Sequence, residues 1–383
     1  MKFVLQRKNI LLVIYGVFIV AVASAISNPV IFRKTELVLP YVNIAVILLG
    51  IAITLLKNNA KDFFYIVIGS VLVLSIHFIN GSSYGSIVSY LGLILAIILF
   101  SESSFEDDTV KIIAGLGFIY LFLSLLRSQT FFKTFSTGVS SINPNTICVF
   151  IAVFSVFVNA EFYRHSLWAI IYNLFALYTI FKYESRTSLA AFILFLVFTY
   201  FVPRKIWKNK KVTIIIFSIV FILAIVFPIF YINAPAKLVS MVTSITHKSF
   251  YSGREIIWGR FYRSLMNPKN LIIGPGSSQE SVYTTIAIFG QQRVFSMHSS
   301  YLGIMLNFGL LGIFYFYYFI LKRVLAIYDQ DISDKQIISL IGLIMILIIG
   351  STEVIFTYSY FVFFFAMIMS TISSSAVKSV YSE

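Results

Sequence analysis

PRKIWKNKKVTIIIFSIVFILAIVFPIFYI, residues 203–232, joins a dense run of lysine and arginine to a long apolar stretch. The apolar part, 212–231, has the length of roughly 20 residues that an α-helix needs to cross the hydrocarbon core of a bilayer. The cationic part cannot follow it into the lipid, because a charged side chain is costly there. The stretch therefore predicts a membrane-spanning helix whose first turn lies at a membrane face.

The composition extends this interpretation to the whole chain. Of its 383 residues 59% are hydrophobic and only 11% are charged, and the mean hydropathy is +0.92. An ordinary globular domain carries about 25% charged residues. The single cysteine, Cys148, lies inside an apolar run, which excludes a disulfide framework and a cysteine metal cluster.

About twelve apolar segments approach the length that a bilayer requires. They predict an all-α polytopic membrane protein with one integral membrane domain, residues 1–383. The first segment lacks a convincing cleavage pattern and is expected to be a retained anchor. The segments run over 10–27, 37–56, 63–79, 84–100, 110–126, 144–160, 167–182, 187–202, 212–231, 299–320, 336–350 and 354–372.

The distribution of lysine and arginine predicts the orientation. These residues concentrate in the segments that lie on the same side as the N-terminus, with the cluster at 203–211 as the strongest anchor. Because cytoplasmic loops carry an excess of positive charge, we expect both termini in the cytoplasm. The long segment 232–297, between the ninth and tenth spans, is then extracytoplasmic.

This long loop is cationic although it falls on the side that is usually poor in lysine and arginine. Long loops obey the charge rule weakly, so the orientation stands. An anionic ligand would explain the charge, whereas contact with lipid headgroups is the alternative for any single arginine. The charged residues are Lys237, Lys248, Arg254, Arg260, Arg263, Lys269 and Arg293, against Glu255 and Glu280.

One helix is predicted inside the loop, over 253–266. Ser252 followed by Glu255 has the pattern of a capping box, with Ser252 at the N-cap. The helix should end before Asn267-Pro268, because the residue before proline avoids helical geometry.

The side chains of this predicted helix divide into two faces. An apolar stripe of Ile257, Phe261 and Leu265 and a cationic face with Arg260 and Arg263 would let it lie on the outer membrane surface. Arg254 is unusual, because the positive end of a helix repels a cation in its first turn. An anion near Arg254 would remove this cost.

Three further stretches hold candidate residues. Arg186 lies at the outer mouth between two short helices, and either a polar cavity or Glu184 could be its partner. Asn145, in the stretch 141–150, could line a sugar site or cap a helix. Gly274 and Gly276 flank a proline and predict a turn.

His298 lies in FSMHSSYLGIMLNFGLLG, residues 295–312, at the start of a predicted span on the side of the cationic loop. A lone histidine at a membrane interface is more often structural than catalytic. Near neutral pH, however, an unperturbed histidine is partly deprotonated and can accept a proton from a hydroxyl.

Several motifs are absent from the sequence. It contains no HExxH, no CxxC pair, no Walker motif and no DxD-like pair on the outer side. Because the loop has few carboxylates, no metal site and no cofactor are expected. Any enzyme here should stabilise anionic charge with arginine.

Taken together, SGREIIW (252–258), the glycine turn at 274–276 and HSSYLGIMLNFGLLG (298–312) resemble the O-antigen polymerase/ligase superfamily, and most closely the Wzy-type polysaccharide repeat-unit polymerases. NPNT at 143–146 and SRTSL at 185–189 are similar to recurring outer-side segments of that group. Ser299 stands where asparagine is common in the family.

The resemblance implies a GT-C-like membrane fold and an inverting, metal-independent glycosyl transfer at the outer face of a bacterial inner membrane. The donor would be a growing glycan on undecaprenyl diphosphate, and the acceptor a repeat unit on the same lipid. The implied partners are these lipid-linked oligosaccharides, membrane lipid, a chain-length regulator and a flippase, without nucleic acid.

The chemistry of that transfer assigns roles to residues of this chain. His298 is the expected base. Arginines suit the diphosphate because guanidinium binds phosphate oxygens in a fork. Ser252, Asn145 and Tyr301 are candidates either for contact with the sugar or for supporting the residues that touch it. The diphosphate candidates are Arg186 and Arg254, followed by Arg260, Arg263 and Arg293.

Other functions remain open on the sequence. A ligase of the same superfamily would use the same motifs. A transporter of lipid-linked sugars would need polar residues within its spans, and the predicted spans hold few. A scaffold that binds anionic polymer would not need His298.

Overall fold

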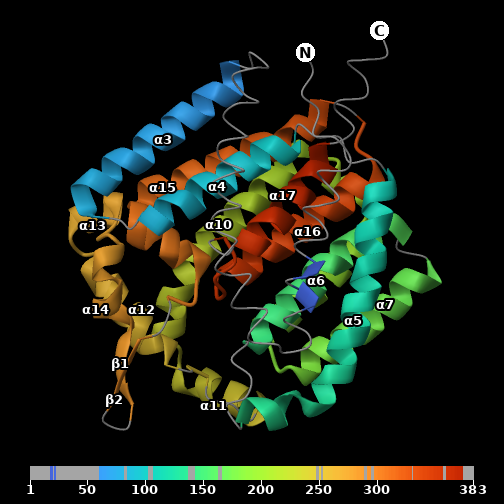
Figure 1. Ribbon diagram of the computed structural model, residues 1–383, viewed down its shortest axis with the longest axis horizontal. Helices are drawn as coiled ribbons and strands as arrows, with labels where there is room; N and C mark the ends of the chain where they lie inside the picture. The colour runs from blue at the N-terminus through green and yellow to red at the C-terminus, as the bar shows by residue number, and fades with distance from the viewer. Residues whose placement is uncertain are drawn as a thin grey trace.

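The computed structural model describes residues 18–19, 21–22, 60–81, 84–101, 107–136, 143–162, 166–246, 250–251, 253–288, 291–294, 297–329, 331–356 and 359–373. Long apolar helices make up most of these ranges (Figure 1). The longer helices are α3 (Ala60–Asn80), α4 (Tyr84–Ser101), α5 (Asp107–Ser136), α6 (Pro144–Phe162), α7 (Leu167–Lys182), α8 (Arg186–Tyr200), α10 (Lys210–Ile232), α15 (Ser300–Leu325), α16 (Asp334–Gly350) and α17 (Ser359–Ser373).

These ten helices coincide with the predicted apolar segments from 63–79 onward. The segment 37–56 and most of 10–27 lie outside the described residues. Within the described ranges, four helices are long and apolar enough to cross a membrane: Asp108–Arg127, Pro144–Phe162, Lys210–Ile232 and Ser300–Asp329. The sequence-based expectation of apolar helices is therefore confirmed.

Helices α6 and α16 form the centre of the bundle. Every residue of α6 from Ile147 to Ala160 is buried, as is nearly all of α16. Helix α6 packs against α5, α7, α8 and α16, and α17 packs between α4 and α16. Because both central helices are apolar on every side, the bundle buries them completely rather than along one stripe.

Polar contacts gather at two ends of the bundle. At one end, called here the far end, Lys335 Nζ donates to Glu161 Oε2 at 3.2 Å, and Arg204 of the short helix α9 (Arg204–Trp207) pairs with Asp334. The sequence analysis predicts that all these segments lie on the same side of the membrane as the N-terminus.

The other end, called here the site end, holds the long loop and the turn between α16 and α17. Asn145 at the start of α6 contacts Glu353 of that turn, while Glu161 near the end of α6 belongs to the far end. Sixteen helical residues separate the two layers by about 24 Å. This distance is close to the ~30 Å of a bilayer core.

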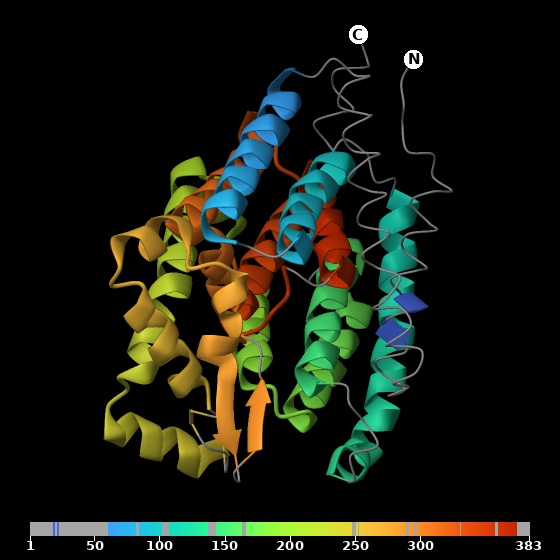
Figure 2. The same cartoon turned by 60° about the vertical axis from the view of Figure 1, so that its left-hand side comes forward.

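The long loop folds into short helices and a hairpin that lie together toward one end of the molecule (Figure 2). Within the described ranges the hairpin is the one departure from the all-α expectation. Its strands pair antiparallel, Thr285 opposite Val294. The loop's elements are α11 (Ala236–Thr246), α12 (Arg254–Ser264), α13 (Pro268–Ile273), the 3-10 helix η1 (Ser277–Gln279), α14 (Glu280–Thr284), β1 (Thr285–Ile288) and β2 (Gln291–Val294).

The predicted loop helix exists as α12, but two details of the prediction were wrong. Gly253, with φ +82°, is the N-cap instead of Ser252, and it provides no side-chain cap; Ser252 itself lies outside the described residues. The apolar stripe of α12 packs inside the protein instead of lying on the membrane surface. Ile257 and Phe261 are buried, and α12 packs on α10.

The Gly274-Pro275-Gly276 turn docks against a break in α15. Gly309 has non-helical angles within α15, which frees carbonyl groups of the preceding turn. Gly276 N–H donates to Leu306 O at 2.8 Å, and Asn80 Nδ2 donates to Asn307 O at 2.9 Å. The predicted turn is confirmed, and its backbone attaches the long loop to α15 through a hydrogen bond.

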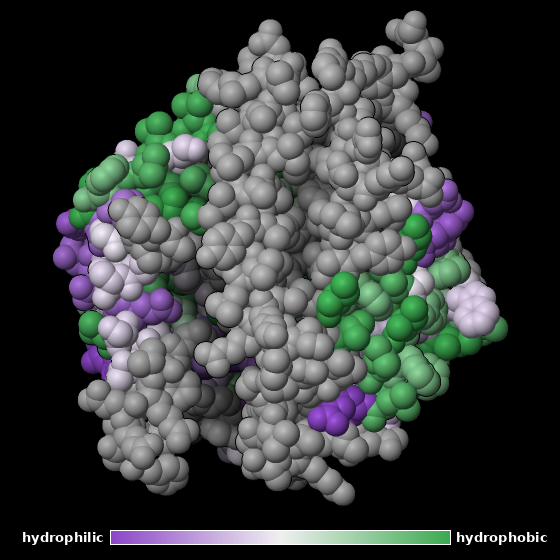
Figure 3. Space-filling view, in the orientation of Figure 1, coloured by the Kyte–Doolittle hydropathy of each residue, from purple (hydrophilic) through white to green (hydrophobic). Residues whose placement is uncertain are grey.

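Apolar side chains dominate the described surface over α5 and α7, at the lower right of Figure 3. Leu167, Leu174 and Phe181 of α7 are each more than 60% exposed. A contiguous apolar surface of this kind is typical of contact with lipid.

We predict that Gly274→Ala destabilises the protein. Gly274 has φ +79°, and an added Cβ would lie 2.5 Å from Met305 O. The left-handed backbone alone costs about 1–3 kcal/mol. Thermal unfolding in detergent should show a lower midpoint, whereas Gly115→Ala, whose Cβ meets no atom within 4 Å, is the matched control. Equal midpoints for the two variants would contradict the docking role.

Candidate functional site

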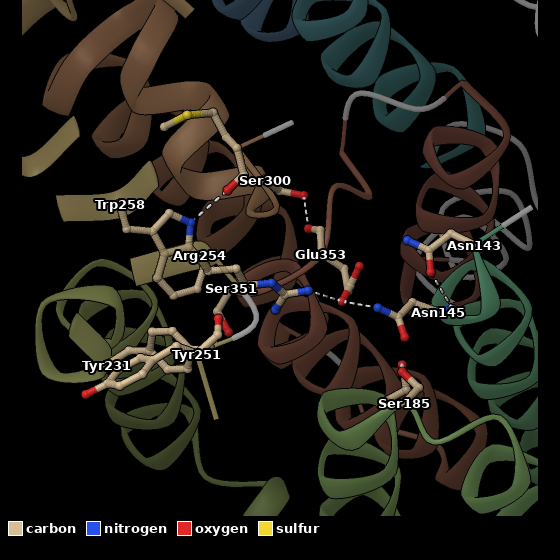
Figure 4. A network of polar contacts seen from close by, with 12 residues as sticks. Asn143, Asn145, Ser185, Tyr231, Tyr251, Arg254, Trp258, Ser300, Ser351 and Glu353 are labelled. Atoms are coloured by element: carbon tan, nitrogen blue, oxygen red, sulfur yellow. Dashed lines mark hydrogen bonds and ion pairs between the residues drawn. The ribbon is translucent and has the colours of Figure 1, made fainter. Parts of the chain in front are cut away.

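Glu353, in the turn between α16 and α17, is the centre of the polar network at the site end (Figure 4). Its Oε1 accepts from Arg254 Nη2 at 3.1 Å and from Asn145 Nδ2 at 2.7 Å. The three side chains come from α12, the α16–α17 turn and α6. One carboxylate oxygen thus joins the long loop to the centre of the bundle.

The backbone of Glu353 also fixes the start of α15. Ser300 N and Ser300 Oγ both donate to Glu353 O, at 3.1 and 2.8 Å. The Ser300 hydroxyl in turn accepts from Ile355 N at 2.7 Å. The turn that carries the carboxylate is therefore bonded to the helix that follows His298.

Arg254 reaches Glu353 from the first residue of α12. The segment before it is held by Tyr231, whose single hydroxyl proton is shared between Phe250 O and Tyr251 O at 2.5 and 2.6 Å. The guanidinium carbon lies 6.0 Å from the ring centroid of Trp258, one turn along the helix. Glu353 supplies the anion that a cation at a helix N-terminus requires.

His298 follows a residue that Trp258 holds in place. Trp258 Nε1 donates to Met297 O at 2.8 Å, which anchors the residue before His298. Ser299 then caps α15 through its side chain. His298 has φ +51°, a left-handed conformation that is uncommon for a non-glycine residue, and residues of this kind cluster at functional sites.

The electrostatics of the cluster couple His298 to Arg254. Burial and then the positive charge of Arg254 lower the pKa of His298 from 6.5 to about 4. The imidazole is therefore neutral at physiological pH. Burial raises the pKa of Glu353, while the charge and hydrogen bond of Arg254 and the amide of Asn145 oppose the rise.

Arg186, the first residue of α8, lies at one end of an apolar groove of about 620 Å³ between α8 and α10. Ser351 and Thr352, the two residues before Glu353, line the same groove. The remaining wall is almost entirely apolar, with residues such as Leu194, Leu223 and Phe227. The groove thus leads from an apolar surface to the polar cluster.

Arg254 and Arg186 both act on the environment of Tyr231. The Tyr231 hydroxyl lies within electrostatic reach of Arg254 and Arg186, and also of Glu255. The structure therefore brings together His298, Arg254 and Arg186, which are three of the residues that the sequence singles out.

Two other candidates, Tyr301 and Asn145, have different surroundings. Tyr301 is fully buried between Phe221 and Phe356 and donates to Leu347 O, so it cannot reach a sugar. Asn145 does enter the cluster, but its amide is bonded to Glu353 and its role there is to hold the carboxylate.

The remaining loop arginines do not join the network around Glu353 in the described contacts. Arg260 Nη1 donates to Thr285 O at 2.6 Å and ties α12 to the hairpin. Arg263 is exposed and bonds to Gly259 O of its own helix. Arg293 lies in β2 opposite Ile286. Arg260 and Arg263 thus have structural or surface positions.

Glu353 was missed in reading the sequence. A signal existed: it is an isolated acid in GSTEV, 350–354, between two apolar segments on the predicted outer side. A carboxylate at a membrane edge is costly without a cationic partner, and the long loop on that side is rich in cations.

The described residues contain no group of three or more His, Cys, Asp or Glu side chains that could hold a metal ion.

Comparisons of the chain with protein-family models, with curated proteins and with solved structures find no match.

We predict that His298 titrates near pH 4, below the usual 6.5, in NMR spectra of histidine-labelled protein. Because the unfolded chain binds this proton more readily, the folded state loses stability as pH falls from about 6.5 to about 4. His298→Gln should remove that part of the loss. Arg254→Gln should move the midpoint of His298 upward, and an unchanged midpoint would contradict the coupling.

Proposed function

We propose that the chain is a glycosyltransferase that polymerises lipid-linked repeat units. A growing glycan would pass from undecaprenyl diphosphate onto a repeat unit carried by the same lipid. The observation that carries the proposal is the placement of Arg254, Arg186 and His298 at the site end of an apolar helical bundle. The family resemblance of the sequence favours the same reaction.

The leaving diphosphate accounts for the arginines. Diphosphate is a stable anion, so its departure needs charge stabilisation more than a proton. Arg254 and Arg186 would bind its oxygens, because guanidinium presents paired N–H donors to phosphate. Held in a half-buried site, such donors stabilise developing charge more strongly than they would in water.

The acceptor hydroxyl accounts for the histidine. The hydroxyl oxygen attacks the anomeric carbon of the donor, the bond to diphosphate breaks, and the hydroxyl proton passes to the imidazole of His298. A histidine must be neutral to act in this way, and the lowered pKa of His298 keeps it so. Its rigid turn, fixed by Trp258 and Ser300, favours alignment of the reactants.

The groove between α8 and α10 fits a lipid-linked substrate. An apolar chain could lie along Leu194, Leu223 and Phe227 while its phosphate end reaches Arg186. Thr352 Oγ1, at the groove wall, is buried without a hydrogen-bond partner in the described contacts. A buried hydroxyl of this kind favours a polar ligand group nearby.

The proposal includes the membrane arrangement. In this arrangement the chain has about twelve spans in a GT-C-like fold, with both termini in the cytoplasm and the site end at the outer face of a bacterial inner membrane. The separation of the polar layers by about one bilayer core supports such an arrangement. The transfer is proposed to be independent of metal and cofactor.

The decisive experiment uses purified protein with a lipid-diphosphate repeat unit in the presence of EDTA. A ladder of lengthened glycans is expected on gels. Absence of turnover together with translocation of the substrate across vesicles would support a transporter instead. Transfer only to a different lipid or protein acceptor would support a ligase.

We predict that His298→Ala and His298→Gly both abolish polymer formation while the protein still inserts in the membrane. Glycine suits the left-handed backbone at this position, so His298→Gly should fold at least as well as His298→Ala. Polymer assays on variants with matched membrane levels test this. Glycan of normal length from either variant would exclude His298 as the base.

We predict that Arg254→Lys lowers turnover at least 100-fold. Lysine keeps the positive charge, but its ammonium group lacks the planar fork of N–H donors. It therefore cannot bind a phosphate through two parallel hydrogen bonds while also contacting Glu353. Arg263→Lys, on the exposed face of the same helix, is the control and should retain activity. Full activity of Arg254→Lys would contradict the need for paired N–H donors and would show that a positive charge alone is sufficient at this position.

A further inference from the structure

Glu353 holds Arg254 in the way that a phosphate would. Its carboxylate is only 10% exposed, and one oxygen accepts from Arg254 and from Asn145 at hydrogen-bond distances. A phosphate oxygen has the same charge and accepts the same donors. A negative group of the chain itself therefore binds the guanidinium of Arg254.

A diphosphate bound at Arg254 would have to share this arginine with Glu353. Two anions near one cation repel each other, and the repulsion is strong where water is largely excluded. Movement of Arg254 toward the ligand would leave Glu353 buried with Asn145 as its remaining donor in this pair of contacts. The carboxylate thus opposes a bound anion and favours return of the arginine.

This opposition matters most after glycosyl transfer, on the premise that the proposed function is correct. The donor is a diphosphate diester, whereas the product is a monoester whose terminal phosphate loses its second proton near pH 6. The product therefore carries about one additional negative charge. Arginines that bind the donor would bind the product more tightly and delay its release.

We propose that Glu353 is a positioning residue that competes with the diphosphate for Arg254 and so promotes release of the lipid diphosphate product. When the product leaves, the carboxylate of Glu353 replaces its negative charge beside Arg254 and restores the ion pair between the two residues. The backbone carbonyl of Glu353 accepts from Ser300 at the start of α15, just after His298. The side chain of Glu353 can therefore be changed without removing that contact.

The test measures binding of farnesyl diphosphate, a soluble monoester, by calorimetry on the full chain in detergent. Glu353→Gln removes the negative charge and keeps an acceptor for Asn145. We expect it to bind farnesyl diphosphate about tenfold more tightly, with kcat and KM of the polymerase both reduced. Glu353→Asp, which restores the charge, should return both values toward those of the unmodified protein.

A matched control lies at the far end. Glu161 is also 10% exposed and pairs with Lys335 at 3.2 Å, so Glu161→Gln breaks a similar ion pair away from the site. It should leave the affinity for farnesyl diphosphate unchanged. Glu353→Met is measured beside Glu353→Gln, because an apolar side chain of similar length avoids a buried amide if that variant does not fold.

The outcomes separate the inference from the proposed function. Unchanged or weaker binding by folded Glu353→Gln or Glu353→Met, while the unmodified protein binds and polymerises, would overturn the role of Glu353 alone. An equal gain in affinity for Glu161→Gln would do the same. No binding and no polymer from the unmodified protein would overturn the proposed function itself.

Discussion

The ion pair between Arg254 and Glu353 holds the site end of this molecule together. Both side chains are largely removed from water, at 18% and 10% exposure, so each depends on the other. Removing one partner of such a pair typically costs about 3–5 kcal/mol, because it leaves a charge uncompensated. The pair attaches the long loop to the bundle, and the backbone of Glu353 positions the start of α15 beside His298.

The helices were predictable from the sequence because apolar runs near the length of a bilayer have few other solutions. The short hairpin was not, because TIAI and QQRV, residues 285–288 and 291–294, are too short for a clear pattern. The N-cap residue of α12 was also assigned wrongly. The capping-box pattern of Ser252 and Glu255 is local, whereas Tyr231 holds the preceding segment and Gly253 makes the turn.

For the site, the sequence identified Arg254 and His298, because a cation in a first helical turn and a histidine beside a cationic loop are unusual in themselves. It could not identify their partner, since Glu353 lies 99 residues from Arg254 along the chain. Nor could it orient Tyr301. A helix that is apolar on every side gives no indication of which face is buried, and Tyr301 proved to belong to the core.

The same electrostatics link the two substrates of the proposed reaction. Beside burial, the charge of Arg254 helps to keep His298 neutral, and it also makes the imidazole a weak base. A diphosphate at Arg254 would cancel part of that charge and raise the pKa of His298. The histidine would then accept the hydroxyl proton more readily once the donor is bound. Binding of the donor would thus prepare the base for the acceptor, which disfavours proton removal in its absence.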